Sequence, residues 1–283
     1  MGWIRSRILS RKLALACCFV AIATGATPSY SQINVGGGGN FTDTDEYAGQ
    51  DLTGNTLDFN QAGAQVDLRG FNITSNVTIT SSIGDGTIQN SVFSTSKTIN
   101  AAFGTPGVPG GTITFMNSGA VDVILFGGNN TNFTGTFEID MAQADIFRLT
   151  SANAGGNGTI RVREATFDVA VSTSTPIEIG TVGRFPSTLQ SSSGANTASG
   201  PITLGADINI DVTGTQLTLS NAIGDGGNNL GITKRGEGTL VIGGTAVSTY
   251  TGDTTIEAGV VQFGMDNAID AASTISLDGG TLD

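Results

Sequence analysis

The 283-residue sequence contains no histidine, only two cysteines and only 13% charged residues. Without histidine, neither Ser-His-Asp or Cys-His catalysis nor a histidine-ligated metal site can be built. The low charge argues against helices, whose exposed surfaces normally carry more Lys, Glu and Arg. Because both cysteines lie in a segment that we expect to be removed, carboxylate chemistry is the remaining catalytic possibility.

What the sequence has in excess is glycine, at 42 residues, beside an apolar fraction of 38%. This composition is typical of short, uncharged strands separated by tight turns. A glycine content this high also admits disorder, but the regular apolar alternation described below allows real burial and favours a folded chain.

The N-terminal segment 1–31 is of a different kind and predicts a secretory signal peptide. Basic residues between Arg5 and Lys12 precede the apolar run Leu13–Ala23, and small residues follow around Ala26 and Ser31. This order of basic, apolar and small residues is that of a signal sequence. The run is short for a membrane anchor, which needs about 20 residues. Cys17 and Cys18 lie too early to favour a lipoprotein.

Removal of this segment changes the inventory of the exported chain. Both cysteines, Trp3 and four basic residues are lost, which leaves eight basic residues against 24 acidic ones, a net charge of −16. No disulfide framework is then expected, so hydrogen-bond ladders and burial must hold the fold. Nucleic acid is not an expected partner, because phosphate binding needs clustered Lys and Arg.

Behind the signal peptide, residues 32–51 are expected to form a flexible lead-in, and residues 52–283 a series of short strands. Alternation places Leu57 and Phe59 on one face of such a strand. Short strands at this spacing suit either a sandwich or a β-helix. Ser172–Pro201 is rich in Ser, Thr, Gly and Pro, and we expect a loop excursion or an irregular joint there.

Internal repetition favours the β-helix over the sandwich. Val123–Val169 is echoed by Leu240–Asp283, and Thr78–Gly86 by Thr218–Gly226. A solenoid adds one similar coil after another, whereas sandwiches do not usually reuse the same strand and turn pieces. We therefore expect an all-β solenoid with about 20–25 residues per coil, given strands of this length and spacing.

One segment carries a resemblance to a known family. Residues 230–283 contain Thr-Lys-x-Gly-x-Gly-Thr-Leu from Thr233, then Gly243-Gly244, then Thr-Tyr-Thr-Gly-x-Thr-Thr-Ile from Thr249, and finally Gly-Gly-Thr-Leu from Gly279. This order closely resembles the autotransporter-associated β-strand repeat, and residues 115–169 resemble a degenerate copy.

The resemblance implies a right-handed parallel β-helix, the passenger of an autotransporter-type protein. It implies export, with the passenger displayed on or released from the surface of a diderm bacterium and associated with its outer membrane. A membrane-spanning barrel normally follows the passenger in this family, so we expect a barrel on a missing C-terminal part and interpret the chain as incomplete at that end.

Few side chains suggest chemistry. Asp207 and Asp211 share a strand face with Asn209, which fits a carboxylate platform for a sugar or calcium, or simply a solvated strand face, and we favour the latter. The acidic turn at residues 43–46 fits no calcium loop. Gly84-Asp85-Gly86 and Gly224-Asp225-Gly226 are interpreted as turns with positive φ rather than as phosphate cradles.

Two further groups have competing interpretations. Arg161 and Arg163 alternate with apolar residues and lie on one face, either as an outer charge pair, which we favour, or as a contact for an anionic glycan. Lys234 and Arg235 are assigned to a turn of the repeat that needs no ligand. Phenylalanines within alternating strands are expected to form a stacked core ladder: Phe115, Phe126, Phe133, Phe137, Phe147, Phe167 and Phe263.

The sequence therefore predicts a secreted structural or adhesive passenger with no catalytic residue, no cofactor and no metal. One alternative is a β-helical polysaccharide lyase or hydrolase, for which Asp207, Asp211 and Arg184 form the single grouping to nominate. Another is a binding module whose Thr- and Asn-rich outer face contacts a surface glycan or another ligand on a host or neighbouring cell.

Overall fold

In the computed structural model, the described residues all lie between Ile33 and Asp283. They are residues 33–35, 56–59, 65–67, 72–73, 78–81, 85–90, 96–104, 111–117, 123–142, 144–180 and 186–283. The expected signal peptide, the acidic turn at residues 43–46 and Arg184 lie outside this set, and so does most of the expected lead-in.

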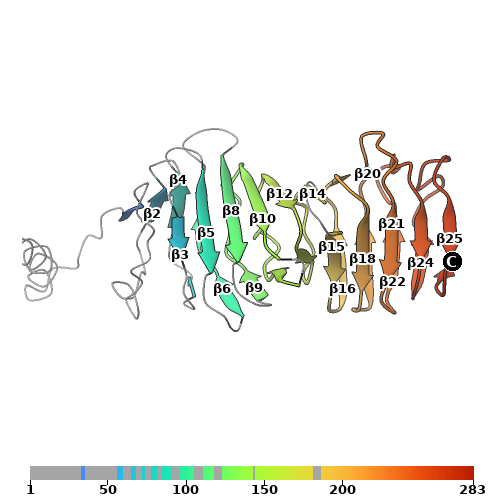
Figure 1. The fold of residues 1–283 in the computed structure, drawn as a ribbon, viewed down its shortest axis with the longest axis horizontal. Coiled ribbons are helices and arrows are strands. Elements are labelled where there is room, and N and C mark those ends of the chain that lie inside the picture. Colours follow the sequence, from blue (N-terminus) through green and yellow to red (C-terminus); the bar gives the residue numbers. More distant parts are fainter. Residues whose placement is uncertain are drawn as a thin grey trace, which may run out of the picture. The chain divides into compact units, whose positions relative to one another are not determined.

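The described residues form 26 strands and no helix, and the strands make four parallel sheets, which we name A to D (Figure 1). Sheet A contains β1 (Ile33–Val35), β2 (Thr56–Phe59), β4 (Thr78–Ser81) and β7 (Ala102–Phe103). Sheet B contains β3 (Gln65–Asp67), β5 (Gly86–Asn90), β8 (Thr112–Asn117), β10 (Thr136–Asp140), β12 (Thr159–Val162), β14 (Ile177–Ile179), β17 (Ile202–Leu204) and β20 (Ile223–Gly224).

The other two sheets contain the remaining strands. Sheet C contains β6 (Lys97–Ile99), β9 (Val123–Phe126), β11 (Ile146–Leu149), β13 (Thr166–Asp168), β15 (Thr188–Ser191), β18 (Ile208–Val212), β21 (Ile232–Arg235), β23 (Thr254–Ile256) and β25 (Ile275–Leu277). Sheet D contains β16 (Ala195–Ala198), β19 (Gln216–Leu219), β22 (Thr239–Ile242), β24 (Val260–Phe263) and β26 (Thr281–Leu282).

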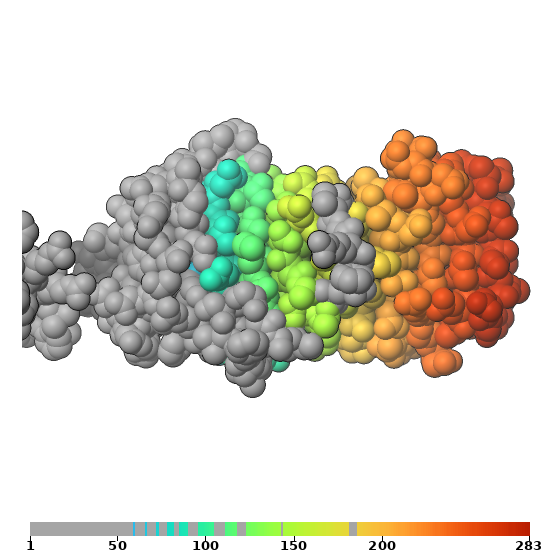
Figure 2. All heavy atoms as spheres, viewed as in Figure 1, coloured from blue at the N-terminus to red at the C-terminus, as the bar shows by residue number. Residues whose placement is uncertain are grey.

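Strand order shows how the chain winds. From β5 to β20 it moves between sheets B and C, and the strands of sheet A at β7 and of sheet D at β16 and β19 come after a C strand and before a B strand. From β21 to β26 it alternates between sheets C and D. Sheets A and D are therefore two parts of one third side of a β-solenoid, the predicted fold class. Successive coils follow one another as bands of colour in Figure 2.

Register between coils is close to the predicted repeat length. Phe147 pairs with Phe167 and Ile208 pairs with Ile232, so that both separations along the chain fall in the expected range. The shortest separation lies in sheet B, where Ile160 pairs with Ile177, and the longest occurs both in sheet B, between Ile88 and Phe115, and in sheet C, between Lys97 and Ile124. Loops of different length at the corners absorb these differences, so the strands themselves stay in register.

Alternation of side chains explains why these segments are strands. In β18, Ile208, Ile210 and Val212 are buried, while Asn209 and Asp211 lie on the outer face. The same inward and outward pattern recurs along sheets B and C, which is the period of two that a half-buried strand requires. Inward residues of successive coils stack on one another and form one continuous core.

Aromatic rings fill that core in the middle of the described chain, as predicted. Six of the seven phenylalanines expected to form a core ladder are 0–1% exposed. Phe133 and Phe137 stack with ring centroids 4.0 Å apart, and Phe126 lies 5.0 Å from Phe147. Phe263 is the exception, because it lies in β24 near the last coil and is only partly buried. Beyond Phe167 the core consists mainly of Ile, Leu and Val.

The prediction of a loop excursion was wrong for the described residues of 172–201, which leave out 181–185. The described part of this segment contains β14, β15 and β16, and its apolar residues Ile177, Ile179 and Leu189 are buried. Its polar composition reflects outward positions and the corners, because strands this short need only one or two inward apolar residues. The segment also starts sheet D, through a bridge between Thr173 and Ala198.

On the third side of the solenoid, between the strands of sheets A and D, the side chain of Asn130 forms hydrogen bonds to two other coils. Asn130 is 0% exposed; its Oδ1 accepts from the Phe103 N–H at 2.9 Å, and its Nδ2 donates to the Ala154 carbonyl at 2.6 Å. These three residues belong to successive coils. Asn130 thus continues the inter-coil hydrogen bonding where the backbone turns.

The turn prediction for the two Gly-Asp-Gly motifs is only partly confirmed. Gly226 has a positive φ of 63°, but Gly86 lies in β5 and Gly224 in β20. Gly86 is needed for space, because a Cβ there would collide with the ring of Phe59. Gly84 is not among the described residues.

One corner between sheets C and D requires glycine, and this requirement can be tested. Gly259 has a φ of +68°, and a Cβ there would collide with the carbonyl oxygens of Gly236 and Gly238 in the previous coil. We expect Gly259→Ala to destabilise the coil by about 2–3 kcal/mol, from backbone strain plus the collision. Hydrogen exchange of the β22 and β24 amides measures this loss.

Gly194 supplies the control for this substitution. Its φ is +62°, but nothing lies within 4 Å of a Cβ placed there. Gly194→Ala should therefore cost only the strain of about 1 kcal/mol. Equal losses for the two variants would show that close stacking of the corners does not demand glycine.

Candidate functional surface

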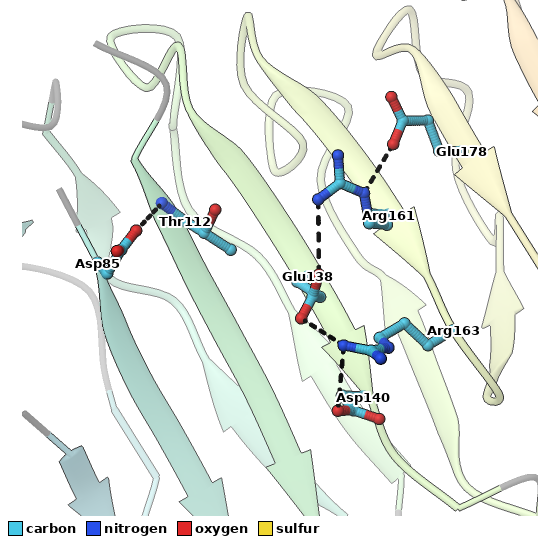
Figure 3. Close-up of polar contacts among 7 residues, drawn as sticks. All are labelled: Asp85, Thr112, Glu138, Asp140, Arg161, Arg163 and Glu178. Atoms are coloured by element: carbon cyan, nitrogen blue, oxygen red, sulfur yellow. Dashed lines mark hydrogen bonds and ion pairs between the residues drawn. The ribbon is translucent and has the colours of Figure 1, made fainter. Parts of the chain in front are cut away.

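The outer face of sheet B holds a network of ion pairs that spans three coils (Figure 3). Arg161 Nε contacts Glu178 Oε2 at 2.7 Å, and Arg161 Nη1 lies 3.5 Å from Glu138 Oε2. Arg163 Nη1 lies 3.3 Å from the other Glu138 oxygen and 3.8 Å from Asp140. Glu138 is therefore shared by both arginines, and β10, β12 and β14 are joined through side chains.

This geometry bears on the two interpretations of Arg161 and Arg163. Both side chains point outward, as alternation predicted, and both guanidinium groups already contact carboxylates. The hydrogen bond to Glu178 raises the pKa of Arg161 despite its partial burial. An anionic glycan would have to displace these carboxylates, so the arrangement favours the charge-pair interpretation.

A second polar contact lies on the outer side of sheet C. Asp168 is 0% exposed and accepts hydrogen bonds from Arg148 Nε at 2.6 Å, from the Ser192 hydroxyl at 2.6 Å and from the Ser192 N–H at 3.0 Å. The sequence analysis missed this carboxylate. The sequence holds one signal for it: Arg148 and Asp168 are separated by one coil length and occupy outward positions of β11 and β13.

The carboxylates nominated for catalysis or calcium do not form a site with other acidic residues. Asp211 lies on the outer face of β18 beside Arg235, its partner in register. Asp207 is exposed and accepts a hydrogen bond from the Gly231 N–H at 2.7 Å. Across the described ranges, no group of three or more Asp, Glu, Cys or His side chains is placed to hold a metal ion.

Lys234 was assigned wrongly to a turn. It lies in β21 facing the core and is 0% exposed. Its Nζ donates to the carbonyl oxygens of Arg235 at 2.7 Å, Gly236 at 2.7 Å and Ala258 at 3.1 Å. The pKa of Lys234 is lowered overall, because the effect of burial exceeds the opposing effect of the nearby Asp211 and Glu237 carboxylates. The ammonium group therefore joins the corners of two successive coils from inside.

Arg235 makes the matching contact from outside. Its Nε lies 2.7 Å from Glu257 Oε2 on the next coil, and both side chains are exposed by more than a third. The hydrogen bond from Arg235 lowers the pKa of Glu257. The two basic residues of the repeat motif thus contact the same neighbouring coil, one through buried carbonyls and one through a surface ion pair.

Another buried carboxylate fixes the loop after β20. Asp225 is 1% exposed and accepts hydrogen bonds from the N–H groups of Gly227, Leu230 and Thr251 and from the Thr251 hydroxyl, at 2.8–3.1 Å. Burial raises the pKa of Asp225, but these hydrogen bonds lower it by more, so the net pKa lies well below its ordinary value. Asp225 thereby fixes the loop to the following coil.

The shared carboxylate on sheet B gives a testable difference. We expect Glu138→Gln to weaken the β10–β12 pairing by up to about 1 kcal/mol, since the pairs are only partly buried. Glu178→Gln removes one arginine contact rather than two and should cost less. Amide exchange in β12 at low and high salt checks this, and a larger effect of Glu178→Gln would contradict the proposed sharing.

Asp225 predicts acid sensitivity of its loop. Because its pKa is lowered in the folded chain, its stabilisation is present above the ordinary value of 3.8 and is lost as the pH falls toward the folded value. We expect the Leu230 and Thr251 amides to exchange progressively faster as the pH falls below the ordinary pKa of an aspartate. Asp225→Asn should produce fast exchange of these amides already at neutral pH. The control Asp253→Asn, at an exposed aspartate, should not. Identical pH profiles for wild type and Asp225→Asn would contradict the account.

In the described part of the chain, no helix is long and apolar enough to cross a membrane. Residues 232–263 match the family model described as Passenger-associated-transport-repeat. No curated protein and no solved structure gives a significant match. The matched residues run from β21 to β24 and contain Lys234, Arg235, Glu257 and Gly259, so the repeat coincides with the corner contacts described above. A chain with this repeat inside a parallel β-solenoid fits an autotransporter passenger repeat protein, and the predicted resemblance is confirmed.

Proposed function

We propose that the chain is an exported structural and adhesive passenger, secreted or displayed at the surface of a diderm bacterium. The observation that carries the proposal is the passenger repeat at residues 232–263, embedded in a parallel solenoid. A solenoid of stacked coils is suited to presenting an extended surface rather than a single pocket.

The interactions of the outward carboxylates support a non-catalytic role. Asp168 and Glu138 are engaged by arginines, and Asp225 is engaged by backbone N–H groups. A glycoside hydrolase instead keeps two carboxyl groups free to face one sugar bond. We expect no reducing ends and no unsaturated uronates after prolonged incubation with neutral and anionic polysaccharides. Release of either product, abolished by Asp207→Asn, would favour the lyase or hydrolase alternative.

One face is particularly suited to adhesion. The outward positions within the five strands of sheet D carry no charge, although the whole chain has a net charge of −12. The one acidic side chain that contacts them is that of Asp283 after β26, which accepts a hydrogen bond from Gln262 at 2.7 Å at the end of this face in the described chain. A neutral face with hydroxyl and amide groups fits an uncharged glycan on a cell surface better than the ion-paired face of sheet B does. These outward residues are Ala195, Thr197, Gln216, Thr218, Thr239, Val241, Val260, Gln262 and Thr281.

Adhesion can be measured with beads coated with the purified chain and presented to bacterial and host cells. We expect the coated beads to attach, and soluble neutral glycans to compete. Thr218→Asp places a charge on sheet D, and Thr203→Asp places one on the outer face of sheet B as the matched control. Attachment should fall for Thr218→Asp alone; no attachment by the wild-type chain would overturn the adhesive role.

Export is tested separately by the mass of the secreted product. When the whole sequence is expressed in a diderm host, we expect a product that begins near residue 27 or 32, without Cys17, Cys18 and Trp3. Retention of the intact chain in the cytoplasm would contradict export while leaving the adhesion result interpretable.

A further inference from the structure

The corner before β12 holds the one Asn-Gly pair of the sequence, Asn157-Gly158. An asparagine followed by glycine is chemically distinctive, because the next backbone nitrogen can attack the side-chain carbonyl carbon, and a glycine without a Cβ does not hinder this attack. Asn157 is exposed, so water reaches its side chain. The reactivity of the pair then depends on what holds the Gly158 nitrogen.

Hydrogen bonds distinguish this asparagine from others at the same stacked corners. The exposed asparagines there are Asn129, Asn132, Asn153 and Asn157. The N–H groups that follow the first three donate to backbone carbonyls at 2.8–3.1 Å, Asn130 to Asn153, Phe133 to Asn130 and Ala154 to Ser151. Within the described part of the chain, the Gly158 N–H donates no hydrogen bond. Of these four asparagines, Asn157 alone is followed by a free backbone nitrogen.

The pair also lies in the contact between two coils. The Asn157 side-chain Nδ2 donates to the Thr131 carbonyl at 2.6 Å, and the Thr159 N–H, at the start of β12, donates to the Gly135 carbonyl at 3.0 Å. A Cβ on Gly158 would collide with the Gly135 carbonyl oxygen. A change in the length of the main chain at this point therefore has no spare room.

We propose that Asn157-Gly158 is a self-modification site, at which Asn157 is converted into aspartate and isoaspartate without an enzyme. The Gly158 nitrogen loses its proton to solvent and bonds to Cγ of Asn157, and the side-chain nitrogen leaves as ammonia. Water then opens the resulting cyclic imide at either of its two carbonyl carbons, which gives aspartate or isoaspartate. The reaction consumes one water molecule, releases one ammonia and needs no oxidant or cofactor.

Both products weaken the contact between the coils. The new carboxylate cannot donate to the Thr131 carbonyl, and isoaspartate adds one carbon to the main chain directly before β12. Because Gly158 already lies against Gly135, β12 shifts relative to β10, its partner in register. Arg161, which β12 holds beside Glu138, shifts with it. The modified chain thus gains a negative charge and loses part of the β10–β12 pairing.

Incubation of the folded full chain, followed by peptide mass mapping and labelling with an isoaspartate methyltransferase, tests the proposal. We expect Asn157 to be modified about tenfold or more faster than Asn132 or Asn153, since one intramolecular hydrogen bond to break accounts for about that factor. The rate should rise with pH, because the attacking nitrogen must be deprotonated. Modification of Asn157 no faster than that of Asn132 and Asn153, or only after unfolding in denaturant, would overturn the proposal.

Variants separate the reaction from its consequence. Asn157→Gln keeps an amide donor but forms the larger ring far more slowly, so position 157 should stay unmodified. The matched control Asn153→Gln, at an exposed position of the same corner, should leave the reaction at Asn157 unchanged. Asn157→Asp represents one product and should speed amide exchange in β12 without any incubation, while β22 stays unchanged. Equal β12 exchange before and after the reaction would contradict the weakening of the coil contact.

Discussion

Phe137→Ala should destabilise the middle of the solenoid by about 3–5 kcal/mol, the range for removing a buried phenylalanine. Phe137 is 0% exposed, and its ring lies 4.0 Å from that of Phe133, 5.0 Å from Phe103 and 5.1 Å from Phe126 between centroids. Because these rings come from successive coils, the cavity would weaken several coils together. Hydrogen exchange of the β8, β10 and β12 amides measures the loss region by region.

Met116 provides the control on the same sheet. It is 39% exposed on the outer face of β8, so Met116→Ala should change exchange little. Phe137→Leu should cost less than Phe137→Ala, because it fills part of the cavity. If Phe137→Ala lowers the stability no more than Met116→Ala does, the stabilising role of the ring cluster is contradicted. Local exchange is the suitable readout, since long stacks of repeats need not unfold in one step.

Lys234→Met should cost about 2–4 kcal/mol, although it preserves most of the side-chain volume. The substitution leaves the carbonyls of Arg235, Gly236 and Ala258 without their shared donor. The loss is limited because burial of the ammonium group is itself unfavourable. Faster exchange of the amides in β21 to β24, with β12 and β13 unchanged, is the expected result.

The neighbouring Arg235→Met is the control for this prediction. Arg235 contacts Glu257 at the surface, where ion pairs contribute little. The buried lysine should therefore matter more than the exposed arginine, although the two are adjacent in the motif. A larger effect of Arg235→Met would show that the corner is held from outside rather than inside.

Much of the fold follows from the sequence by local physics. Alternation identifies inward residues such as Ile208 and Ile210, and both are buried as a period of two requires. Repetition distinguishes a solenoid from a sandwich, because each coil must present the same inward and outward pattern to the next. The phenylalanine ladder follows from the same alternation.

The placement of the repeats could not be predicted in this way. Val123–Phe126 and Leu240–Ile242 begin similar sequence units, yet the first lies in sheet C and the second in sheet D. Phe133 accordingly precedes a strand of sheet B, whereas Tyr250 precedes a strand of sheet C. Sequence similarity records the succession of strand and corner, but which side of the solenoid each strand occupies depends on the accumulated corner lengths.

The roles of the buried polar residues also could not be predicted from the sequence. Lys234, Asn130 and Asp168 are each 0% exposed, and each forms at least one hydrogen bond with a group of a different coil. A linear sequence shows them as ordinary polar residues of turns or strand surfaces. Their roles become visible only when the partner one coil away is known, which requires the register rather than the residue pattern.

The central claim is that parallel strands stack in register, one coil after another, and spin-label distances test it most directly. The labels go on outward positions of one sheet C column, in the chain with Cys17 and Cys18 replaced by serine. This column consists of Val123, Ile146, Thr166, Thr188, Asn209, Thr233, Thr255 and Ser276.

At ~4.8 Å per strand, labels at Thr166 and Thr255, four coils apart, should lie about 19 Å apart, and labels at Val123 and Ser276, seven coils apart, about 34 Å. Distances in this proportion would support the stack. Distances that do not increase with the number of intervening coils would contradict it, because antiparallel or sandwich pairing brings residues distant in this column back together.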